Sequence, residues 1–166
     1  MTWPQRFLAL FREIEAPLSV VLGADGCREG WLQAEFFRHF QKQGLATNQT
    51  VSGAKHDLLY DVHPRMVAEV KIYTEDIKRH RNQISARGKV PWSLADIESL
   101  RPEKGSYLAD VRRLMKMQAP EERYMILVLP VAKDRVISNV HVVPSESEID
   151  EEFQSFRVRI SMLHNI

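Results

Sequence analysis

Two carboxylates and one amine, Asp57, Glu69 and Lys71, are spaced so that one small element could bring them together. Carboxylates that are held close to each other repel unless a positive charge lies between them. A divalent cation meets this requirement, and Mg²⁺ prefers oxygen ligands at about 2.0–2.1 Å. Such a cation polarises a phosphodiester and helps to generate hydroxide, while an ammonium group stabilises the negative charge that develops. These residue types therefore indicate metal-assisted cleavage of phosphodiester bonds, if the fold brings them together.

A β-hairpin is the element that would position these side chains. The sequence predicts two strands and the loop between them at residues 56–62, 66–74 and 63–65, respectively. In the register that this loop gives, Asp57 lies opposite Lys71, and Leu59 lies opposite Glu69. Because side chains alternate along a strand, the three charged groups share one face, with Asp57 diagonal to Glu69 at about 7–8 Å. The other face of the second strand is wholly apolar and is expected to pack on a core.

Helical and strand patterns on both sides of this hairpin predict the fold class. Apolar residues at helical spacing predict helices at about residues 4–15, 28–43, 93–100, 106–117 and 146–153. Short apolar or alternating runs predict strands at about residues 19–22, 47–52, 124–131, 136–143 and 156–162. This order predicts an α/β fold with a central mixed β-sheet flanked by α-helices, in a single domain over residues 1–166.

The length and composition of the chain predict one domain, and its cysteine content is typical of a reducing compartment. With 166 residues, the chain can bury most of its apolar surface without disulfides. Its one cysteine, Cys27, cannot form an internal disulfide, and no stretch approaches the roughly 18–20 apolar residues that cross a bilayer. The first residues lack the basic-then-apolar order of a signal peptide. We therefore expect a cytoplasmic protein without a membrane partner.

Charge is unevenly distributed along the chain, although the formal net charge is only +1. A basic segment without acidic residues contains Lys78, Arg79, Arg81, Arg87 and Lys89. An acidic run follows near the end of the sequence, over residues 146–152. This asymmetry could give one face that attracts the phosphates of a nucleic acid. Two solvated surfaces would produce the same pattern, so the charge supports nucleic-acid binding without deciding it.

The hairpin resembles the D…(D/E)XK signature of the PD-(D/E)XK, or restriction-endonuclease-like, superfamily of nucleases. The matching segments are His56-Asp57-Leu58-Leu59-Tyr60 and Ala68-Glu69-Val70-Lys71. Together with a preceding helix that bears a glutamate, and a following helix and buried strand, the resemblance covers residues 28–131. It implies a restriction-endonuclease-like core, dependence on Mg²⁺ (with Mn²⁺ as a substitute), and hydrolysis of DNA or, less often, RNA. His56 stands where the family often has a proline that has no chemical role.

The resemblance also implies a role for each residue of the hairpin. Asp57 and Glu69 would be metal ligands, together with the main-chain carbonyl of Val70. Lys71 would be the catalytic lysine. Asp61 shares the face of Asp57 but lies nearer the loop and farther from the lysine, so it is the weaker candidate for a ligand.

Two residues of the second predicted helix could be the assisting glutamate of the family, Glu29 and Glu35. Glu29 lies at the start of the helix on the same stripe as Leu32 and Phe36, which is expected to be buried. Glu35 points to a flank of the helix. We prefer Glu29 for this reason and keep Glu35 as the alternative.

Two functions of different classes are consistent with these patterns. The first is a Mg²⁺-dependent endonuclease acting on DNA in restriction, repair or a mobile element, with Asp57, Glu69 and Lys71 catalytic and Glu29 assisting. The basic segment would hold the phosphate backbone, and a homodimer would let so small a chain cut both strands. The second is a catalytically silent module of the same fold that binds nucleic acid or a protein partner. Metal binding and cleavage distinguish the two.

Overall fold

The computed structural model describes residues 1–24, 26–51, 53–73, 93–102, 104–118, 120–130 and 147–163. Two of the predictions fall outside these ranges. They are the basic segment from Lys78 to Lys89 and the strand at residues 136–143. No helix in the described ranges is both long enough and apolar enough to cross a bilayer.

The described strands form one six-stranded sheet in the order β1-β2-β3-β4-β6-β5. Their bounds are β1 Leu45–Val51, β2 Ala54–Tyr60, β3 Met66–Ile72, β4 Glu122–Pro130, β5 Ser147–Glu152 and β6 Phe156–Met162. Strands β3 and β4 pair in parallel, and the other neighbouring strands pair antiparallel. The prediction of an α/β fold with a central mixed sheet flanked by helices is therefore confirmed.

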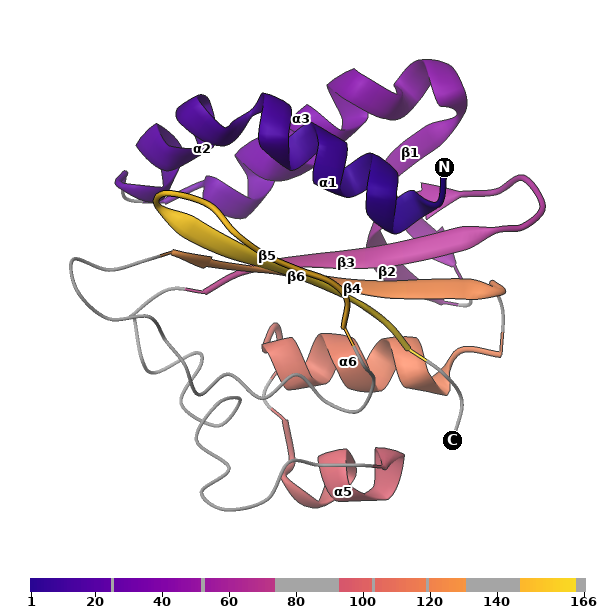
Figure 1. Ribbon diagram of the computed structural model, residues 1–166. Coiled ribbons are helices and arrows are strands. Elements are labelled where there is room, and N and C mark those ends of the chain that lie inside the picture. The colour runs from indigo at the N-terminus through magenta and orange to yellow at the C-terminus, as the bar shows by residue number, and fades with distance from the viewer. Residues whose placement is uncertain are drawn as a thin grey trace.

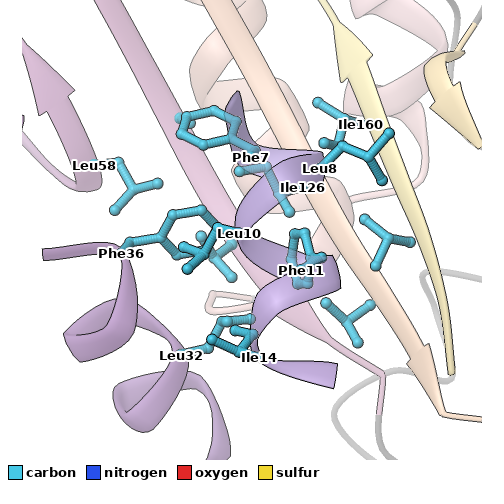
Figure 2. Packing of buried hydrophobic residues seen from close by; sticks show 14 of the residues in the cluster. Phe7, Leu8, Leu10, Phe11, Ile14, Leu32, Phe36, Leu58, Ile126 and Ile160 are labelled. Carbon is cyan, nitrogen blue, oxygen red and sulfur yellow. The ribbon is translucent and has the colours of Figure 1, made fainter. Parts of the chain in front are cut away.

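Three helices cover one face of this sheet (Figure 1). They are α1 Trp3–Glu13, α2 Glu15–Leu22 and α3 Arg28–Phe40, and a short 3₁₀ helix, η1 Gln41–Gln43, leads from α3 into β1. Figure 2 shows apolar side chains of α1 and α3 pointing toward one another and toward the strands. The ring of Phe36 lies 5.2 Å from that of Phe7 and 5.8 Å from that of Phe11, both edge to face. Burial of these large rings is the main force that fixes α3 on the sheet.

Two further described helices lie on the opposite side of the sheet, α6 next to the strands and α5 beyond it, against α6 (Figure 1). They are α5 Leu94–Ser99 and α6 Tyr107–Lys116. Ser93 and Ser106 cap them, since each serine hydroxyl accepts the backbone N–H of the residue three positions on. Apolar residues of both helices pack with Val67 of β3 and Leu127 of β4. Because helices cover both of its faces, β3 is buried along its whole length.

Two predicted elements have the wrong type. Residues 19–22, predicted as a strand, form the end of α2, where Pro17 sits in the first helical turn and does not end α1. Residues 146–153, predicted as a helix, contain β5. In this strand Asp150 forms ion pairs with Arg157 and Arg159 of β6. These cross-strand pairs explain why an acidic run adopts an extended conformation.

We expect the Phe36→Ala substitution to lower the free energy of unfolding by about 3–5 kcal/mol, because it leaves a cavity among three aromatic rings. Chemical denaturation monitored by circular dichroism measures this loss. Phe37 is the matched control, since it follows on the same helix and is 42% exposed. Phe37→Ala should cost less than about 1 kcal/mol. Equal losses for the two variants would contradict the packing described here.

Candidate active site

The predicted register of the hairpin was wrong by two residues. Strands β2 and β3 pair with Leu59 opposite Val67, where Glu69 had been expected. The connection runs over residues 61–65 and is therefore longer than the predicted three-residue loop. Because a shift of two residues keeps the alternation of side chains, Glu69 and Lys71 stay on the face opposite the apolar residues of β3.

The pairing of β2 with β3 stops before the charged residues. Beyond that point, main-chain N–H groups of β3 donate to carboxylates and not to β2. The ladder covers Leu58 to Tyr60 of β2. Beyond it, the N–H of Val70 donates to Asp57 Oδ2 at 2.8 Å, and the N–H of Ile72 donates to Glu29 Oε1 at 3.1 Å. These bonds satisfy main-chain donors that a longer β2 ladder would have used. They also fix two acidic side chains along one edge of β3.

Asp57 does not project toward α6 as Glu69 and Lys71 do. Its Oδ1 accepts a hydrogen bond of 2.8 Å from the side-chain amide of Gln33, which belongs to α3. The carboxylate thus lies at the edge of β3, between that edge and α3. The expectation that the three groups share one face is met by Glu69 and Lys71 and corrected for Asp57, because β2 has left the ladder at this point.

Asp57 is nevertheless close enough to Glu69 to feel its charge. Burial, together with the negative charge of Glu69, raises the pKa of Asp57 from 3.8 to about 6, although the bond from the Val70 N–H opposes the shift. Two neighbouring carboxylates that lack a shared cation show this behaviour.

Glu69 is 2% exposed and has two partners at the same oxygen. His56 Nδ1 lies 2.5 Å from Glu69 Oε1, and Arg113 Nη2 lies 2.7 Å from it. His56 is itself buried, and its imidazole contacts the carboxylate directly. Burial of a charged Glu69 is therefore compensated by a guanidinium from α6.

Lys71 lies at the centre of the charged cluster. Its Nζ is 3.1 Å from Asp110 Oδ2, 3.1 Å from the carbonyl oxygen of Gly105 and 3.7 Å from Glu29 Oε2. Burial acts to lower the pKa of Lys71, but the charges of Asp110 and Glu29 outweigh burial and raise that pKa above its usual value. At neutral pH the amine is consequently an ammonium group, which can stabilise negative charge but cannot act as a base.

The structure brings Glu29 to the site and leaves the other candidates outside it. Glu29 contacts β3 and Lys71, whereas Glu35 pairs with Arg38 on the surface of α3. Asp61 is exposed in the connection after β2. The predicted nucleic-acid ligands from Lys78 to Lys89 lie outside the described residues.

Sequence reasoning missed four residues of the cluster: His56, Gln33, Asp110 and Arg113. A signal for Asp110 was present, because it shares the inward stripe of α6 with Tyr107 and Leu114. A carboxylate on such a stripe needs a buried partner. Gln33 follows Glu29 by four residues and so lies on the same side of α3. The partners of these residues are distant in sequence, and the fold was needed to identify them.

The charged cluster contains more acidic groups than basic ones, so a divalent cation would reduce its net negative charge. It contains four carboxylates (Asp57, Glu69, Glu29 and Asp110) and two groups that are always positive (Lys71 and Arg113). When ionised, these six groups together carry a formal charge of −2, a costly arrangement in a largely buried site.

The oxygen donors gathered near the edge of β3 include two carboxylates and one main-chain carbonyl. No group of three or more His, Cys, Asp or Glu side chains in the described ranges is arranged to hold a metal. Asp57 and Glu69 can each still offer lone pairs, because one carboxylate has about four acceptor sites. The Val70 N–H points to the side of Asp57, and in a strand the carbonyl of the same residue points to the same side. Two carboxylates, one carbonyl and water are oxygen ligands of the kind that Mg²⁺ takes.

We expect the metal-free protein to lose stability as the pH rises from about 4 to about 6, because the unfolded chain ionises Asp57 first. An acid whose pKa is raised on folding binds its proton more tightly in the folded state, so stability falls until the folded pKa is passed. Asp57→Asn keeps an acceptor for the Val70 N–H and removes the charge. It should raise the free energy of unfolding at pH 7 by about 1–3 kcal/mol and flatten the pH profile. Urea denaturation at several pH values in EDTA tests this, and an unchanged profile would contradict it.

No family model, no curated protein and no solved structure matches this chain.

Proposed function

We propose that the chain is a Mg²⁺-dependent nuclease with a restriction-endonuclease-like core. It would hydrolyse phosphodiester bonds, with DNA favoured over RNA as the substrate. The observation that carries the proposal is the edge of β3. There Asp57 and Glu29 replace strand pairing, beside the buried side chains of Glu69 and Lys71. Four carboxylates gathered around Lys71 and Arg113 leave an excess of negative charge, and cation-assisted phosphodiester chemistry gives a reason for it.

Each residue of the site would have a distinct task. Asp57, Glu69 and the Val70 carbonyl would hold the cation, and Gln33 would fix the orientation of Asp57 through its amide. When bound, the cation would polarise the phosphodiester and make a water molecule more acidic. Lys71 would stabilise the negative charge that develops on the phosphate, because its ammonium form is favoured by Asp110 and Glu29.

A second candidate function is a catalytically silent module of the same fold. The observation that favours it is the pairing of Glu69 with Arg113 and of Lys71 with Asp110, which satisfies both groups without any ligand. In that case the cluster would only stabilise the contact between β3 and α6.

Incubation with Mg²⁺ and a panel of single-stranded, duplex and branched DNAs and RNAs tests the choice. We expect cleavage of at least one DNA, and no cleavage in EDTA. A protein that binds no Mn²⁺ in calorimetry and cuts none of the panel would favour the silent module. If the protein does cleave, the preferred member of the panel identifies its class of substrate.

A further inference from the structure

Arg113 connects the buried acids of the cluster to solvent. Its guanidinium lies 2.7 Å from Glu69 Oε1 and 3.0 Å from Asp110 Oδ1. The side chain of Arg113 is 34% exposed, whereas those of Glu69 and Asp110 are 2% and 6% exposed. A ligand that approaches Glu69 from solvent would therefore approach a positive group as well.

A guanidinium and a divalent cation compete for the same carboxylate oxygen. Both are positive, so they also repel each other when they share Glu69. Arg113 has a second anchor in Asp110, which belongs to the same helix three residues earlier. If the bond to Glu69 is given up, Arg113 thus stays at the site and has N–H donors to offer.

We infer that Arg113 binds the phosphate of the substrate. Until a cation binds, Arg113 is paired with Glu69 and is not available to the phosphate. The inference rests on the proposed function. When Glu69 binds a cation, Arg113 would leave Glu69 and donate to a phosphate oxygen through its other N–H groups, while Asp110 still accepts from its Nη2. The planar fork of a guanidinium suits phosphate oxygens, and this geometry distinguishes an arginine from a lysine at this position.

Metal binding alone tests the competition at Glu69. In calorimetric titration with Mn²⁺ and no nucleic acid, Arg113→Gln should bind Mn²⁺ about tenfold more tightly than the wild type. Arg113→Lys, which keeps the charge, should stay close to the wild type. Arg112 is the matched control, since it is the neighbouring arginine on α6 and no contact with Glu69 is found for it. Arg112→Gln should leave the affinity unchanged, and thermal melting checks that each variant is folded.

Nucleic-acid binding tests the phosphate role. In a Lys71→Met background, which slows cleavage of the probe, the affinity for a fluorescein-labelled DNA duplex in Mg²⁺ should fall about tenfold on Arg113→Gln. In EDTA the same substitution should have no effect, because Glu69 then retains Arg113. With Lys71 present, Arg113→Gln should slow cleavage about 100-fold, and Arg113→Lys should not restore the rate.

The outcomes separate this inference from the proposed function. Unchanged or weaker Mn²⁺ binding by Arg113→Gln overturns the competition. Tighter Mn²⁺ binding with unchanged DNA affinity and unchanged cleavage overturns the phosphate role, while the nuclease assignment stands. A wild type that binds Mn²⁺ but neither binds nor cuts nucleic acid overturns the proposed function, and the phosphate role of Arg113 with it.

Discussion

Replacing Lys71 by methionine should reduce cleavage of nucleic acid by the Mg²⁺-loaded protein by about 10²–10³-fold. The ammonium group lies in a buried cluster, where a fixed charge stabilises a developing negative charge far better than in water. Methionine has a similar length and remains compatible with burial, so the packing of β3 against α6 is largely kept. Initial rates on a labelled oligonucleotide at saturating Mg²⁺ measure the effect.

Two controls make the Lys71 result specific. Lys42→Met removes an exposed lysine of η1 and should leave the rate unchanged. Thermal melting should show that Lys71→Met is folded, although Asp110 loses its closest ammonium partner. Folded Lys71→Met with a wild-type cleavage rate would contradict the assigned role of the lysine.

Adding Mn²⁺ or Mg²⁺ should stabilise the wild-type protein, and removing the metal should abolish cleavage. Binding to the folded state alone adds about 2.7 kcal/mol at a metal concentration one hundred times the dissociation constant. The stabilisation should be largest above pH 6, where Asp57 is ionised and repels Glu69. Thermal melting as a function of Mn²⁺ concentration, at pH 5 and pH 7.5, measures it.

The same titration on two aspartate variants locates the cation. Asp57→Asn should lose most of the metal-dependent stabilisation and the cleavage activity. Asp61→Asn is the matched control, because Asp61 is exposed in the connection after β2 and should not be a ligand. Stabilisation that survives in Asp57→Asn and is lost in Asp61→Asn would move the site to the loop, against the geometry described here.

The face of β3 that carries the charges could be predicted from the sequence because alternation has a fixed period. Ala68 to Ile72 alternate apolar and charged residues, and an even register error leaves this alternation intact. The register itself depends on the length of the connection, which residues 61–65 extend beyond the predicted loop. The bond between Asp57 and the Val70 N–H could not be predicted, since it forms only where β2 leaves the ladder.

The two wrong elements have different physical causes. The apolar run at residues 19–22 is too short for periodicity to distinguish a strand from a helix, and its contact with the core through Leu18 and Leu22 decides for α2. The local pattern of the acidic run in β5 predicts a helix. The arginines of β6 that pair with it come later in the sequence and are not part of that pattern. The partners of Glu69 and Lys71 on α6 were missed for the same reason. A local pattern can show that Asp110 needs a buried partner, but it does not identify that partner.

A crystal soaked in Mn²⁺ and measured at a wavelength where manganese scatters anomalously gives the most direct test of the cation site. We expect one peak at the edge of β3, at about 2.0–2.3 Å from oxygens of Asp57 and Glu69, with Arg113 turned away from Glu69. No peak at saturating Mn²⁺, or a peak that neither carboxylate contacts, would contradict a metal-dependent nuclease site formed by these residues.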